Sequence, residues 1–130
     1  MGVRFPGTGN NTIVNANVVT TAETIVAMVG PISQSIDSQL VMLFWFLDVL
    51  QGASTTSRSI RLRRGNSLAG TQLNVTSTDV AGAGVIQTGG CYVDFGAGNS
   101  GPLFYVLTFQ VASATGNSTV NDVSLIALML

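Results

Sequence analysis

The feature that most constrains the fold is the regular interruption of the chain by turn-forming residues. Clusters of Gly, Pro, Asn and Ser recur roughly every 8–15 residues and separate short runs rich in β-branched and aromatic residues. Such runs are typical of strands, and turns at this spacing are typical of an antiparallel sandwich. We therefore expect an all-β fold, a single antiparallel β-sandwich that is jelly-roll-like and has about eight strands.

The expected strands follow from the same runs. They cover residues 13–19, 25–29, 40–50, 59–63, 71–78, 85–87, 91–95, 103–114 and 120–130. Helix is the rival interpretation for 40–50, because a short apolar run fits either element. We favour a strand there because the run is β-branched and aromatic and has strands expected on both sides. Residues 1–12 show no periodic pattern, so we expect an extended N-terminal arm followed by one domain over 13–130.

Composition excludes several classes of protein. The chain has 130 residues, of which 46% are hydrophobic and 8% are charged, against a usual charged share of about 25%. A hydrophobic and nearly neutral chain is not disordered. The shortage of Glu and Lys excludes a charged coiled coil. The net charge of −1 argues against a basic nucleic-acid binder, and no apolar run is long enough for a membrane helix.

Chemistry-bearing residues are scarce. The sequence has no His, and its five basic residues are all Arg. The single Cys91 has no basic neighbour that would activate it, and zinc sites of the usual kind need more Cys or His. The six acidic residues are scattered, without a recognisable carboxylate pair. We expect no catalytic residues, no metal and no cofactor, and therefore no enzyme.

Two expected strands are apolar on both faces. In 40–50 the odd residues are apolar, and so are the even residues Met42, Phe44 and Phe46; in the last strand Ile126 and Leu128 lie on the face opposite the expected core residues. A lone antiparallel sandwich normally keeps one face polar. Either long loops cover the second face or the chain is a permanent homo-oligomer. We favour the oligomer, with these five residues in its interface.

The alternating pattern also predicts the interior of the sandwich. We expect the core to include Val41, Leu43, Trp45, Leu47, Cys91, Val93, Phe95, Leu107 and Phe109.

Four of the five arginines gather in 58–64. Arg61 and Arg63 share one strand face, and Ile60 and Leu62 point to the other. One interpretation is a solvated face with salt bridges to the scattered Asp residues of the chain. The other is a contact patch for an acidic partner surface, which suits the bidentate pairing of arginine. A nucleic-acid site is disfavoured, because no aromatic residue interleaves with the arginines.

The arm carries Val3, Arg4 and Phe5 in a stretch rich in Gly and Pro. A frayed terminus is one interpretation of this segment. The other is a segment that becomes ordered on a partner surface, with Phe5 in an apolar groove. We predict the second, and we therefore expect these three residues, with Arg61 and Arg63, to contact a partner.

Three stretches of the sequence resemble a known class of domain. The stretches 60–65, 103–116 and 120–127, with their low charge and Gly/Thr/Ser/Asn turns, look like small jelly-roll domains of tailed-bacteriophage virions. Such domains occur as capsid decoration (cement) proteins and as parts of head or tail fibres. The resemblance implies a homotrimer on the capsid surface of a virion, bound to the major capsid protein and without enzymatic activity. The alternative is a receptor- or glycan-binding tip of a fibre, but Trp45, Tyr92 and Tyr105 lie within strands rather than on exposed loops.

Overall fold

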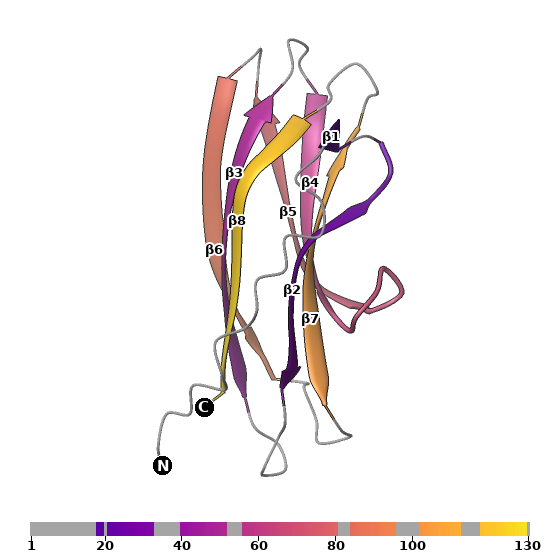
Figure 1. Ribbon diagram of the computed structural model, residues 1–130, viewed down its shortest axis with the longest axis vertical. Coiled ribbons are helices and arrows are strands. Elements are labelled where there is room, and N and C mark those ends of the chain that lie inside the picture. Colours follow the sequence, from indigo (N-terminus) through magenta and orange to yellow (C-terminus); the bar gives the residue numbers. More distant parts are fainter. Residues whose placement is uncertain are drawn as a thin grey trace.

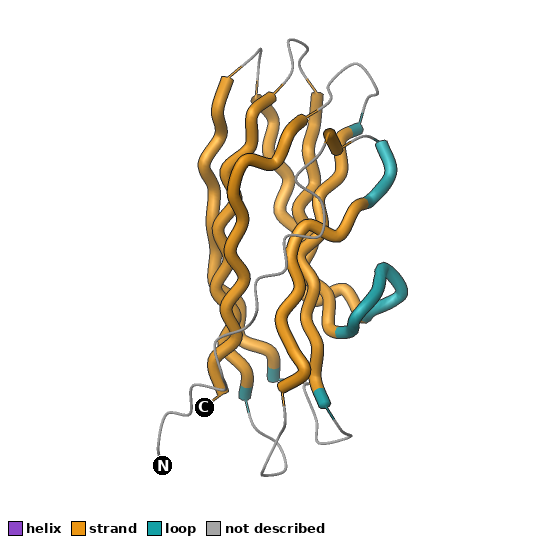
Figure 2. Tube along the Cα trace, viewed as in Figure 1, coloured by secondary structure: helices purple, strands orange, loops and turns teal. Residues whose placement is uncertain are grey.

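The computed structural model describes residues 18–19, 21–32, 40–51, 56–80, 84–95, 102–112 and 118–129. This part of the chain contains eight strands and no helix (Figure 2). The strands are β1 (Val18–Val19), β2 (Thr24–Ile32), β3 (Val41–Gln51), β4 (Thr56–Arg64), β5 (Thr71–Val80), β6 (Gly84–Asp94), β7 (Leu103–Val111) and β8 (Ser118–Met129).

The strands form two four-stranded sheets that face each other as the left and right layers of Figure 1. One sheet has the order β1-β8-β3-β6, and the other has the order β2-β7-β4-β5. Every pairing is antiparallel. A sheet with the order β1-β8-β3-β6 that faces a sheet with the order β2-β7-β4-β5 is the arrangement of an eight-stranded jelly roll. The expected fold class is confirmed.

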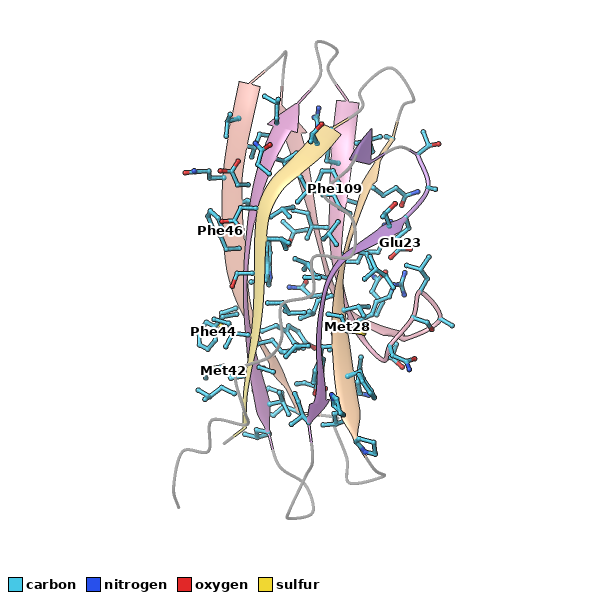
Figure 3. All side chains as sticks on the ribbon, in the orientation of Figure 1. Glu23, Met28, Met42, Phe44, Phe46 and Phe109 are labelled. Carbon is cyan, nitrogen blue, oxygen red and sulfur yellow. The ribbon has the colours of Figure 1, made fainter. Side chains whose placement is uncertain are left out.

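The hydrophobic core lies between the two sheets. Period-two alternation sends the odd residues of β3 inward, and β7 contributes the ring of Phe109, which Figure 3 shows between the layers. Six residues predicted for the core are buried there: Val41, Leu43, Trp45, Leu47, Leu107 and Phe109. The last strand behaves likewise, with Val123, Leu125 and Ala127 inward.

Three other core predictions are wrong. Cys91 is exposed, Val93 is only partly buried, and Phe95 is 77% exposed. The register explains the first two, because Cys91 lies opposite Phe44 and Val93 lies opposite Met42. Directly opposed residues of antiparallel strands point to the same side of a sheet. Since the even residues of β3 point outward, the odd residues of β6 do so too. Phe95 follows the last residue of the strand.

One continuous strand replaces the two expected at 85–87 and 91–95. The strand β6 pairs with β3 over its full length, and Gly89 and Gly90 lie within it rather than in a turn. A Cβ on Gly90 would come within 2.9 Å of the Trp45 indole, and one on Gly89 within 2.8 Å of the Trp45 carbonyl oxygen. These glycines therefore make room for Trp45, and their presence is a matter of packing.

Two inward-facing arginines of β4 tie the sheets together at separate levels. Arg64 forms a bidentate pair with the buried Asp94 of the other sheet, and the Tyr105 hydroxyl donates to Asp94 Oδ2 at 2.9 Å. Burial, and secondarily the charge of Asp94, raises the pKa of Tyr105 well above its usual range. Nearer the start of β4, the buried Arg58 donates from Nε to Ser118 Oγ at 3.0 Å.

Candidate functional site

The outward side of the sheet β1-β8-β3-β6 carries an apolar surface, here called the apolar face. Three neighbouring strands supply it. Its members are Met42, Phe44, Phe46 and Leu50 of β3, Val85, Cys91 and Val93 of β6, and Ile126 and Leu128 of β8.

The strand register brings the predicted interface residues together. Phe44 lies between Ile126 on one side and Cys91 on the other, and Met42 lies between Leu128 and Val93. The structure thus places all five predicted residues on one surface. The sequence-based prediction missed Leu50 and the contribution of β6. Leu50 has the same parity as Phe44 and Phe46, so this signal was present in the sequence.

The apolar face is open to solvent. Phe44 is 40% exposed, Phe46 is 39% exposed and Ile126 is 47% exposed. Figure 3 shows Met42, Phe44 and Phe46 projecting from the left-hand sheet, away from the interior. These exposures argue against the alternative that loops of the same chain cover this side. Large contiguous apolar patches are uncommon on monomeric proteins and mark interaction sites.

The outward side of the three strands approaches the area of a standard contact. Its three strands have 11 or 12 residues each. At roughly 3.4 Å per residue and roughly 4.8 Å between strands, the surface is about 37 Å long and about 14 Å wide. The flat projection is therefore about 500 Å², and side chains add relief to it. A standard interface takes about 800 Å² of accessible surface from each partner, so this side of the sheet, with the polar interruption at Asp48 included, supplies more than half of that area.

Polar side chains interrupt the apolar face between Phe46 and Leu50. Asp48 and Asp122 lie directly opposite each other on β3 and β8. Gln87 Nε2 donates to Asp48 Oδ2 at 3.3 Å, and Asn121 Nδ2 donates to Asp48 Oδ1 at 3.4 Å. Two carboxylates at directly opposed positions repel each other, and the amide donors offset part of that repulsion.

The outward side of the second sheet carries a polar cluster and is here called the polar face. Its centre is a bidentate pair in which Arg63 Nε and Nη2 donate to the two Glu23 oxygens at 2.9 and 3.0 Å. Thr108 Oγ1 donates to Glu23 Oε1 at 2.6 Å, and Arg63 Nη1 donates to the Gly70 carbonyl at 3.1 Å. Figure 3 shows Glu23 on the side of the molecule opposite Phe46.

This pairing changes the ionisation of Glu23. The hydrogen bond from Arg63 is the largest cause and lowers the pKa of Glu23, and the Thr108 hydroxyl and the nearby arginine charges lower it further. Partial burial acts in the opposite direction and is outweighed. Glu23 therefore stays ionised at neutral pH and holds Arg63 in place.

Arg61 and Arg63, both predicted to contact a partner, differ in the bonds that they make within the chain. Arg63 forms an ion pair within the chain, but its partner is Glu23 and not one of the Asp residues that the salt-bridge interpretation named. Arg61 Nη1 donates to Gln110 Oε1 at 2.8 Å, and Arg61 forms no ion pair with another described residue. The prediction that Ile60 and Leu62 point away from these arginines is confirmed by their burial. Val3, Arg4 and Phe5 lie outside the described residues.

The described residues contain no candidate metal site. They contain no group of three or more Cys, Asp or Glu side chains able to hold a metal ion. A hollow lined by Trp45, Ile60, Leu62, Asn74, Thr76 and Leu107 has no room for a water molecule. No helix long and apolar enough to cross a membrane occurs among the residues described.

Comparison with known proteins adds no relative: no family model, no curated protein and no solved structure matches the chain.

Proposed function

We propose that this chain is a non-enzymatic structural protein whose copies associate through the apolar face. The observation that carries the proposal is the position of Phe44, Phe46 and Ile126 side by side on one outer sheet surface, each more than a third exposed. Obligate interfaces resemble a core divided in two, and this surface has that composition. Association would remove these side chains from water, and the other described residues leave them more than a third exposed.

The placement of the protein on a virion rests on the resemblance noted in the sequence. A jelly-roll fold alone does not determine function, although viral shells use it often. We propose a capsid decoration protein that binds the outer surface of a capsid, contacts the major capsid protein and stabilises the head. The number three for its oligomer comes from the resemblance, whereas the apolar face supports self-association of any order.

The polar face is the side that we assign to the contact with the capsid. Its hydrogen bonds are made within the chain, so it gains little from a partner. Arg61 is the exception, because it makes no ion pair among the described residues and retains a donor for an acidic partner group. We therefore assign the contact with the capsid to Arg61 ahead of Arg63.

The first test is the mass of the protein in solution. Phe44→Glu places a charge in the centre of the apolar face, and we expect association to weaken by at least about 30-fold, the equivalent of losing a 2 kcal/mol hot spot. Val75→Glu is the matched control, because Val75 is 46% exposed on the other sheet. Light scattering at micromolar concentration should return an oligomer for the wild type and the control. A wild-type mass of 13.4 kDa would refute self-association.

The second test addresses the virion. Particles banded by density from the virus that encodes the chain should contain the protein, and Arg61→Ala should reduce its amount on particles without changing its mass in solution. Absence of the protein from intact particles would refute the decoration role while leaving self-association untouched.

A further inference from the structure

The four edge strands of the sandwich are not protected equally. An edge presents unpaired backbone N–H and C=O groups, and proteins usually block it with short strands, bulges, Pro or charges. The strand β1 has two residues, and β2 contains Pro31 and two register irregularities. The strand β5 has a register shift near Leu73, and the Asn74 side chain accepts the Val75 N–H at 2.8 Å.

The strand β6 lacks all these features. It pairs only with β3 among the described strands, over 11 residues and without a register shift. From Gly84 to Val93 it contains no Pro and no Lys, Arg, Asp or Glu. Its one formal charge is Asp94, which is buried and bound to Arg64. A long, regular, uncharged edge is the kind that accepts a further strand.

We propose that β6 pairs antiparallel with β6 of a second copy of the chain. The midpoint of the strand is Gly89, so a twofold axis at Gly89 lets all 11 residues pair. In this register Val85 lies opposite Val93, Ile86 opposite Tyr92, and Gln87 opposite Cys91. Two of these three pairs join apolar side chains, the third joins an uncharged polar side chain to a thiol, and no like charges are opposed.

The pairing keeps both copies facing the same way. Residues of equal parity lie opposite each other in this register, so outward residues of one copy meet outward residues of the other. The two sheets become one, and the apolar faces of the two copies become continuous. The contact uses backbone groups at an edge and is therefore distinct from association through the apolar face, on which it does not depend.

Disulfide trapping tests the register directly. Gln87→Cys places a new thiol opposite Cys91 of the second copy, and each dimer would then form two such bonds. Within one chain residues 87 and 91 are separated by about 13 Å along the strand, which is beyond the reach of a disulfide. In the wild type the two Cys91 thiols are offset by the same distance, so we expect no covalent dimer.

A control variant on another edge strand, and a repeat of the experiment in the Phe44→Glu variant, keep the result interpretable. Gln72→Cys puts an exposed thiol on the other long edge strand, β5, and reports random collisions. We expect Q87C to give at least about tenfold more covalent dimer than Q72C on mild oxidation, because only opposed cysteines meet disulfide geometry. Peptide mass analysis should find the 87–91 linkage, with and without Phe44→Glu. Equal dimer yields, or 87–87 and 91–91 linkages in place of 87–91, would overturn the proposal.

Discussion

The two outer faces of the sandwich differ in how their side chains are satisfied. On the polar face, Glu23, Arg63 and Thr108 bond to one another within a single chain. On the apolar face, Phe44 and Ile126 lie directly opposite each other on neighbouring strands, but both side chains remain exposed to water. A few directed hydrogen bonds satisfy a polar group, whereas an apolar side chain gains free energy only when its surface is removed from water. The hydrogen-bonded centre of the polar face is therefore satisfied within one chain, whereas the apolar face has exposed area that a partner could cover.

Polar bonds made within one chain should contribute to the free energy of unfolding of that chain. The strongest case is Asp94, which accepts from Arg64 and Tyr105 in the interior. Asp94→Ala leaves a guanidinium and a phenol without their acceptor, and we expect unfolding free energy to fall by about 3–5 kcal/mol. Urea titration measures the loss. The control Gln72→Ala, at an exposed position, should change it by less than about 0.5 kcal/mol, and a similar small change for Asp94→Ala would contradict the assignment.

Glu23→Gln tests the polar face itself. The substitution removes the ion pair with Arg63, and because the pair is partly exposed we expect a loss of about 1–2 kcal/mol.

The same ion pair predicts a pH dependence. The folded pKa of Glu23 lies below its ordinary 4.5, so its stabilisation is complete above pH 4.5 and is lost as pH falls through the lowered value. Unfolding titrations between pH 6 and pH 3 should show this acid-dependent loss in the wild type and a smaller one in Glu23→Gln. Identical pH profiles for the two proteins would show that Glu23 does not contribute to the loss of stability in acid.

The smallest effect on folding is expected on the apolar face. Ile126→Thr removes apolar area that the isolated chain already exposes, so at high dilution the unfolding free energy should change by about 0.5 kcal/mol or less. At higher concentration the same substitution should weaken association. If instead it destabilises the dilute monomer by more than Glu23→Gln does, Ile126 belongs to the core of one chain and the distinction between the faces fails.

The apolar face was predictable because strand parity was readable in β3 and β8. Both strands are long and uninterrupted, so Phe44 and Ile126 are assigned to the side opposite Leu43 and Leu125 by alternation alone. In β6 the same reasoning failed, and Cys91 was placed inside. In β6 apolar residues occupy both odd and even positions, and the pair Gly89 and Gly90 is typical of a turn. Their packing against Trp45 depends on a strand about 45 residues away.

The polar face was only partly predictable. Alternation separates Arg61 and Arg63 from Ile60 and Leu62, and the structure agrees. The same alternation puts Arg58 with the inward residues, a signal that the prediction did not use. The partner of Arg63 was out of reach, because Glu23 is 40 positions away and only the pairing of β2 with β7 beside β4 brings it close.

The two inward arginines of β4 restrict how the length of this protein can vary. Arg58 and Arg64 are six positions apart, and each reaches the opposite sheet only because both have inward parity. Deleting or inserting one residue between them would turn one guanidinium to the outside and carry Arg61 or Arg63 across with it. Insertions in the loop 65–70, which projects from the right-hand sheet in Figure 1, leave that parity unchanged. Related sequences should therefore differ in length at this loop and keep the six-residue interval in β4.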